Sequence, residues 1–170
     1  ISARVTQAQH RLDQGSLLDQ LDAEIEAIAE AALPGTVHIE VRDQRAWFNT
    51  LSNGAGWFYD DRGHIVTNAH VVGSAATVRV ELFDGRVRDA DVIGVDPLTD
   101  VALLKIDPSP EVFPLRRASS EPLPIGSQVF AFGSPFGIKF SMSRGVVSGL
   151  GRSESANFMG MNRGYTNFIQ

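Results

Sequence analysis

The sequence contains no cysteine. It therefore offers no disulfide framework, no thiolate nucleophile and no cysteine-ligated zinc site. A composition without cysteine suits a cytosolic protein, and it equally suits an exported protein that folds without disulfides. Any covalent chemistry must therefore come from other side chains.

Long apolar segments are also absent. No apolar run approaches the ~20 residues that a membrane-spanning helix needs, and no signal-peptide pattern is present. The chain begins at Ile1 rather than at methionine, so we expect a processed or trimmed form that no longer carries any export signal. These residues by themselves do not indicate a compartment.

Positive charge is sparse and scattered. Lys105 and Lys139 are the only lysines, and the arginines form no basic stripe. The formal net charge is -5 and the isoelectric point is near 5.3. Because nucleic-acid binding needs a concentrated basic surface that neutralises phosphates, the composition argues against a nucleic-acid partner.

Residues 16–33 carry the one clear helical pattern. Ser16 and Asp19 have the spacing of a capping box, and the Pro34–Gly35 pair ends the helix. Such an amphipathic helix either joins subunits or lies on its own domain, and two heptads are too few for a coiled coil, which favours the second interpretation. Apolar side chains recur at spacings of three and four and form one stripe: Leu18, Leu21, Ile25, Ile28 and Ala32.

From Thr36 onward the pattern changes to short strands separated by turn residues. Alternating or wholly apolar runs of four to eight residues, bounded by glycine, proline and aspartate, are typical of antiparallel sandwiches and barrels. The expected strands lie within 36–41, 54–72, 77–96, 101–106, 128–133 and 144–151, with turns at 60–63 and 83–86.

The polar segment "SSEPLPIG", at 119–126, is the best candidate boundary between two β-domains. The sequence thus predicts three parts. A helical segment covers 1–35, a first β-domain covers 36–123, and a second β-domain opens at 124–170.

One histidine lies in an unexpected setting. His70 lies near the end of the stretch "HIVTNAHVV", at 64–72, which has the composition of a buried strand. Asp100 is the leading candidate partner, because it lies where the turn "DPLTD" leads into the apolar run 101–106. A carboxylate buried there needs hydrogen bonds to offset its desolvation. The residues alone also allow His70 to be a satisfied core side chain and Asp100 to cap its own turn, as Asp96 is expected to do.

Several motifs in order resemble one family. "GHIVTNAHVV", "DPLTDVALLKID", "FAFGSPFG", "SRGVVSGLGRS" and the closing "NFIQ" are similar to the HtrA family of serine endopeptidases. The resemblance runs from about Thr36 to the last residue. It implies an all-β fold, the chymotrypsin- or trypsin-like double antiparallel β-barrel, with the second barrel incomplete here and an N-terminal amphipathic helix in front.

The resemblance also implies catalytic roles. His70 would be the general base and Asp100 its orienting partner. A neutral imidazole, with an ordinary pKa of about 6.5, can take a hydroxyl proton near neutral pH and return it to a leaving amine. A buried aspartate holds the correct tautomer and stabilises the imidazolium as it forms.

The nucleophile of such a triad is not evident. Ser134, Ser143 and Ser148 do not lie in G-N-S-G-G or in a G-x-S-x-G elbow. In the family, "NFIQ" leads directly into the G-N-S-G-G segment, which carries the nucleophile and the oxyanion hole. We therefore expect both to lie past Gln170, and we expect a protein that ends there to have no peptidase activity.

His64 raises the possibility of a metal site, because it lies six residues before His70. No third ligand is evident nearby and the HExxH motif is absent. We therefore expect His64 to face solvent beside the 60–63 turn, and we expect no metal and no cofactor.

Further features come from the family. Arg152 matches a family arginine that relays activating signals, with a simple surface cation as the alternative, and residues 153–165 resemble the family's regulatory loop. A homo-trimer, a C-terminal PDZ domain in the parent protein and a periplasmic or periplasm-facing membrane-anchored location are likewise implied only by the resemblance.

The resemblance implies that the function is cleavage of unfolded or damaged proteins after small aliphatic residues, through Ser–His–Asp acyl-enzyme chemistry. The rival interpretation is a pseudoprotease that holds peptides as a scaffold. A third interpretation is an autolysis product or partly ordered chain of an active parent. Because both His70 and Asp100 are present, we favour a catalytic parent.

Overall fold

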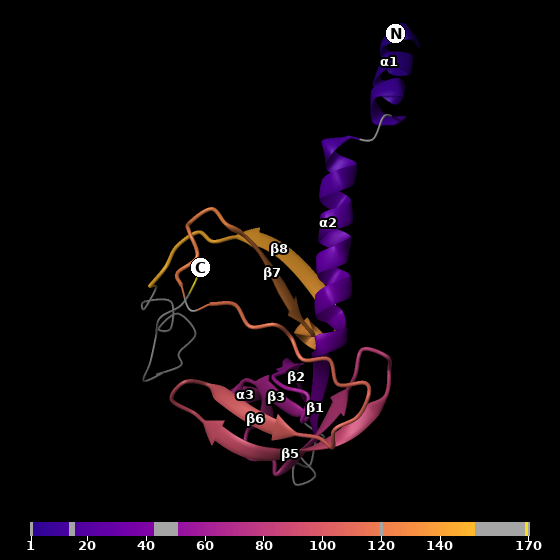
Figure 1. Ribbon diagram of the computed structural model, residues 1–170. Coiled ribbons are helices and arrows are strands. Elements are labelled where there is room, and N and C mark those ends of the chain that lie inside the picture. Colours follow the sequence, from indigo (N-terminus) through magenta and orange to yellow (C-terminus); the bar gives the residue numbers. More distant parts are fainter. Residues whose placement is uncertain (1, 14–15, 43–50, 120, 152–168, 170) are drawn as a thin grey trace. The chain divides into compact units, whose positions relative to one another are not determined.

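The computed structural model describes residues 2–13, 16–42, 51–119, 121–151 and 169. The chain divides into two compact units, Ile1–Ala32 and Leu33–Gln170, and each is described by itself. The first unit is helical and the second is built mainly from strands (Figure 1). None of the helices in the described part of the chain has the length and apolar character needed to cross a membrane.

The first unit contains α1 (Ser2–Asp13) and α2 (Leu17–Ala32), and the short 3-10 helix η1 (Leu33–Gly35) follows. The predicted capping box at the start of α2 is confirmed. The Ser16 N–H donates to the Asp19 carboxylate at 2.6 Å, and the Asp19 N–H donates to Ser16 Oγ at 3.3 Å. Helix α1 was not predicted. Val5 and Leu12 are its only large apolar residues, which is too few to show a helical period.

Six strands of the second unit close into an antiparallel barrel in the order β1-β2-β3-β6-β5-β4, with β1 pairing β4 to complete the ring. Figure 1 shows these strands wrapped around one another, with the short helix α3 (Ala69–Val72) between β3 and β4 in the chain. The strands are β1 (Thr36–Arg42), β2 (Leu51–Phe58), β3 (His64–Thr67), β4 (Thr77–Glu81), β5 (Val87–Asp96) and β6 (Val101–Lys105).

The barrel core follows from strand alternation, because successive side chains of a strand point to opposite faces. On β1, Val37 and Ile39 are fully buried, and Val41 packs against the same core. The 101–106 run forms β6, which lies between β3 and β5 as a central strand. The largest side chains at the centre are Phe58, Ile39, Ile65 and Leu104.

The turn between β2 and β3 needs a glycine. Gly63 has φ +86°, which residues with a side chain rarely adopt, and a Cβ there would clash with the Ile106 carbonyl oxygen. The Ile106 N–H donates to the Gly63 carbonyl at 3.0 Å. The expected turn at 60–63 is thus packed directly against the end of β6.

Beyond the barrel, β7 (Gln128–Gly133) and β8 (Ser141–Val146) run side by side as an antiparallel pair (Figure 1), joined through the 3-10 helix η2 (Pro135–Gly137). The prediction of a strand at 144–151 was wrong in its bounds. The strand starts earlier because polar residues such as Ser141 and Ser143 pair with β7 by backbone hydrogen bonds, which need no apolar pattern.

Candidate active site

His70 lies on α3 and not at the end of a strand, so that part of the prediction was wrong. Strand β3 ends at Thr67, and the chain turns into α3 through Asn68, whose φ of -86° and ψ of 144° are extended. On α3, Ala69, Val71 and Val72 are buried, whereas the His70 side chain is 53% exposed. The β-branched residues that resembled a strand anchor a short helix in the core instead.

Asp100 ends the turn 96–100, which is held by hydrogen bonds to the Asp96 side chain. Asp96 accepts hydrogen bonds from the Thr99 hydroxyl at 2.7 Å and from the Leu98 N–H at 3.0 Å, and these bonds hold the pKa of the Asp96 carboxyl below its ordinary value. Asp96 therefore caps its own turn, as predicted. Asp100 follows with φ +58°, in the left-handed backbone region that residues other than glycine seldom occupy. Its side chain is buried.

The fold brings His70 and Asp100 together across 30 residues of sequence. The imidazole Nδ1 lies 2.8 Å from one carboxylate oxygen and 3.0 Å from the other. The His70 backbone N–H also donates to the carboxylate, at 2.9 Å. In a neutral ring this arrangement keeps the proton on Nδ1 and leaves the lone pair on Nε2.

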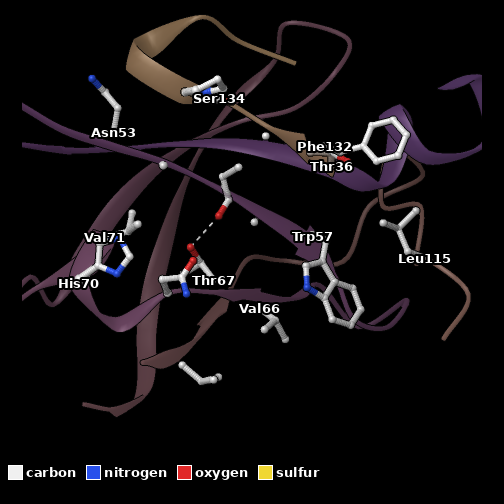
Figure 2. Close-up of a pocket in the computed structure, with 17 residues that line it drawn as sticks. Thr36, Asn53, Trp57, Val66, Thr67, His70, Val71, Leu115, Phe132 and Ser134 are labelled. Atoms are coloured by element: carbon white, nitrogen blue, oxygen red, sulfur yellow. Dashed lines mark hydrogen bonds between the residues drawn. The ribbon is translucent and has the colours of Figure 1, made fainter. Parts of the chain in front are cut away.

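His70 lines a pocket with a volume of about 660 Å³. The pocket lies between the barrel and the β7–η2 segment, and Figure 2 shows His70 and Trp57 on opposite sides of it with Ser134 above them. Its walls come from β1, β2, β3, α3, β6, β7 and η2 together with Leu115. The half-exposed imidazole therefore borders this hollow.

The serines of the described chain do not complete a triad. Ser134 lines the same pocket as His70, but it is buried and its Oγ has no hydrogen-bond partner among the residues that the structure describes. Ser143 and Ser148 are exposed and do not line this pocket. No described serine is thus placed as an activated nucleophile, which requires a neighbouring base.

His64 is half-buried rather than solvent-facing. Its Nδ1 lies 2.8 Å from the carboxylate of Asp60, which also pairs with Arg62. Partial burial raises the pKa of Asp60, but the hydrogen bonds from His64 and Arg62 outweigh that effect and hold the pKa well below its ordinary value. Within the described ranges, no cluster of three or more histidine, aspartate or glutamate side chains has the arrangement of a metal site.

Arg152 and the loop 153–165, which the family resemblance singled out, lie outside the residues that the structure describes.

Asn68 was not predicted as a site residue, although it lies in the quoted "HIVTNAHVV" stretch. Its side-chain amide donates to Asp100 twice, to the main-chain oxygen and to the carboxylate, each at 3.2 Å.

The fold and the histidine–aspartate pair define a class of protein. Residues 54–167, more than half of the chain, match the family model of the trypsin-like peptidase domain. The chain therefore belongs to the trypsin-like peptidase family.

Its relatives narrow the class further. The chain is 41% identical to the periplasmic serine endoprotease DegP of Escherichia coli over 122 residues, which cover 71% of this chain and 24% of DegP. It is 44% identical over 105 residues to the chloroplastic protease Do-like 1 of Arabidopsis thaliana, covering 61% of this chain and 24% of that protein. The chain thus spans about a quarter of the length of these curated relatives.

Solved structures agree. The HtrA-type protease AlgW with a tripeptide superposes with a TM-score of 0.74 at 30% identity, covering 85% of this chain and 44% of that one. The serine endoprotease of Yersinia pestis gives a TM-score of 0.64 at 31% identity, covering 73% and 44%. The predicted HtrA resemblance and the predicted all-β, trypsin-like fold are confirmed.

Proposed function

We propose that the polypeptide containing this chain is a serine endopeptidase of the HtrA type, with His70 as its general base and Asp100 as the residue that orients it. One observation supports these roles above the others. The buried Asp100 carboxylate holds Nδ1 of an imidazole that is 53% exposed and lines the pocket.

The nucleophile is a serine supplied by a segment that follows "NFIQ". This part of the proposal rests on the family resemblance and on the length of the relatives, of which the chain spans about a quarter. The pocket is consistent with it, because residues of β7 and η2 line the same hollow as His70.

The chemistry proceeds in two halves. Nε2 of His70 takes the serine proton while the serine oxygen bonds to the scissile carbonyl carbon, and the same proton then passes to the leaving amine as the peptide C–N bond breaks. Water next bonds to the acyl carbon with His70 again as base. The ester C–O bond to the serine then breaks, the carboxylic acid product leaves, and the proton on Nε2 passes to the serine oxygen. Throughout, the carboxylate of Asp100 stabilises the imidazolium that forms transiently, and the reaction requires no cofactor.

The substrates, partners and location follow as finer parts of the same proposal. The substrates are unfolded or damaged proteins cut after small aliphatic residues, the assembly is a homo-trimer, the parent protein carries a C-terminal PDZ domain, and Arg152 relays its activating signal. Names of relatives from E. coli, Halomonas elongata and Pseudomonas putida place those proteins in the periplasm, which supports a periplasmic location here.

The test is active-site labelling of the full-length polypeptide that carries this sequence. A fluorophosphonate probe should add once to the wild-type protein, and His70→Ala should abolish both labelling and the cleavage of unfolded casein. Lys139→Ala, which changes an ion pair with Glu81 outside the pocket lining, serves as the control and should label normally. A folded wild-type protein that takes up no probe and cleaves nothing would overturn the proposal in favour of a peptide-binding scaffold.

A further inference from the structure

Asn68 occupies the N-cap of α3 but does not cap it. Asparagine is among the preferred N-cap residues because its side chain accepts a hydrogen bond from the backbone of the first turn. Here the backbone of Asn68 has the extended conformation of an N-cap, yet its side chain makes no capping hydrogen bond. The identity of this residue therefore needs another explanation.

Asp100 performs the capping from a distant part of the chain. Its main-chain oxygen accepts the Ala69 N–H at 3.1 Å, and its carboxylate accepts the His70 N–H at 2.9 Å. These two N–H groups belong to the first turn of α3 and would otherwise have no partner within the helix. Asp100 thus satisfies the start of the helix that carries His70.

The side-chain NH2 of Asn68, a donor that N-capping would not use, binds Asp100 in return. It donates both to the main-chain oxygen of Asp100 and to its carboxylate, each at 3.2 Å. The main-chain contact bears on the backbone of Asp100, whose φ of +58° is unfavourable for a residue with a side chain and persists only where neighbours hold it. The carboxylate contact involves the oxygen that lies 2.8 Å from Nδ1 of His70.

We propose that Asn68 is a positioning residue of the active site. It holds the backbone and the carboxylate of Asp100 together, so that the carboxylate is directed at Nδ1 of His70 and the ring keeps its base-competent tautomer. This inference rests on the proposed function for its catalytic consequence, but the hydrogen-bonded state of His70 can be measured without any catalysis.

The expected effect on catalysis is on turnover rather than on binding. Asn68 acts through Asp100, and a carboxylate that rotates away from the imidazole weakens base catalysis without removing a substrate contact. Support residues of this kind typically change activity by about 10- to 100-fold. Asn68→Ala should therefore lower kcat within that range and leave KM within about two-fold.

The experiment compares three variants of the full-length polypeptide. Asn68→Ala removes the amide, Asn68→Asp keeps its shape but replaces the donor with a second carboxylate beside Asp100, and Asn68→Ser keeps one donor. The loss of kcat should be greatest for Asn68→Asp and least for Asn68→Ser. Asp60→Asn is the control, because it perturbs the other histidine–aspartate contact of the barrel.

A spectroscopic readout separates positioning from stability. The chain has four histidines, and His64 and His70 each bind an aspartate through Nδ1. In nuclear magnetic resonance spectra, each such Nδ1–H gives a strongly shifted proton signal. Asn68→Ala should shift or broaden the His70 signal and leave the His64 signal in place, whereas Asp60→Asn should do the reverse.

Each outcome decides the matter. A folded Asn68→Ala protein with the wild-type His70 signal and wild-type kcat would overturn the proposal. Unfolding of all three variants, seen as loss of the His64 signal as well, would also overturn it, because Asn68 would then be a structural residue. If the wild-type protein takes up no fluorophosphonate, the proposed function fails, yet the His70 signal still reports whether Asn68 orients Asp100.

Discussion

Two histidine–aspartate pairs in the same barrel have nearly the same contact and different settings. In each pair Nδ1 lies 2.8 Å from a carboxylate oxygen. His64 and Asp60 are four residues apart in one turn, with side chains 20% and 18% exposed. His70 and Asp100 are 30 residues apart, with side chains 53% and 7% exposed.

The difference lies in what surrounds the contact. Asp60 is held by its own turn, with Arg62 as a competing charged partner. Asp100 is held by groups from α3 and from the N-cap residue Asn68. The His70 imidazole that Asp100 binds lines the pocket. A short Nδ1–carboxylate distance is therefore no evidence of catalysis by itself. An unexposed aspartate that binds an exposed imidazole is the arrangement a general base requires.

Replacement of the buried aspartate should have the largest effect. With Asp100→Asn, the amide no longer stabilises the imidazolium and permits the wrong tautomer. In the trypsin-type enzyme where this change is best characterised, turnover falls by about 10⁴, and we expect a loss of similar size here. The measurement is kcat of the full-length polypeptide on unfolded casein, with Asp60→Asn as the matched control. Turnover within ten-fold of wild type would remove Asp100 from the site.

Gly63→Ala, in the turn that carries the His64–Asp60 pair, should have the next largest effect. The effect should be on the stability of the fold rather than on turnover. Gly63→Ala forces a side chain onto φ +86° and against the Ile106 carbonyl. Strain of this kind destabilises by about 1–3 kcal/mol. Urea unfolding should show a lower midpoint, while kcat per folded molecule stays at the wild-type value. A fall in kcat without a fall in the midpoint would show that this turn communicates with the pocket.

Asp60→Asn should give a smaller, pH-dependent loss of stability. The pKa of Asp60 is lowered in the folded protein from its ordinary value near 3.8. Its ionised form therefore stabilises the fold fully above the unfolded pKa, and that stabilisation is lost as the pH falls toward the lower folded pKa.

The unfolding midpoints of wild type and Asp60→Asn should thus differ most near pH 7 and converge as the pH falls below about 4. Thermal unfolding at pH 7, 4 and 3 measures this, with Asp61→Asn as the neighbouring control. A difference that grows toward low pH would contradict the assignment of the hydrogen bonds.

His64→Gln should have the smallest effect. The change removes one partner of Asp60 and leaves Arg62 in place. Contacts of this type at partly exposed sites contribute about 0–1 kcal/mol. We expect a melting temperature within a few degrees of wild type and unchanged kcat. A loss of activity comparable with that of His70→Ala would make the two pairs functionally equivalent.

Local patterns predicted a large part of this molecule. The alternation at 36–41, the apolar run at 101–106 and the turn at 83–86 each appear as expected in the barrel. The capping box at Ser16 also forms as predicted, because it depends on residues three apart. Strand alternation, turns and capping boxes depend on residues close together in the sequence, so the sequence pattern predicts them.

The predictions failed where contacts between residues far apart in the sequence determine the local structure. The segment that ends in "AHVV" has strand propensity, yet it forms α3 because its N–H groups are satisfied by Asp100 and its apolar residues fill the core. Strand β8 forms from polar residues because β7 supplies its backbone partners. The role of Asn68 depends on a residue 32 positions away, so no local pattern indicated it.

The sequence by itself determined the type of strand-rich fold, the turns and the pair of residues to watch, because alternation, turn chemistry and ordered motifs are local properties of the chain. Only the tertiary structure decided which histidine–aspartate pair faces a pocket. Burial of Asp100, the left-handed backbone that directs its carboxylate and the amide that holds it all come from residues about thirty positions apart. Such groups meet only once the barrel has closed.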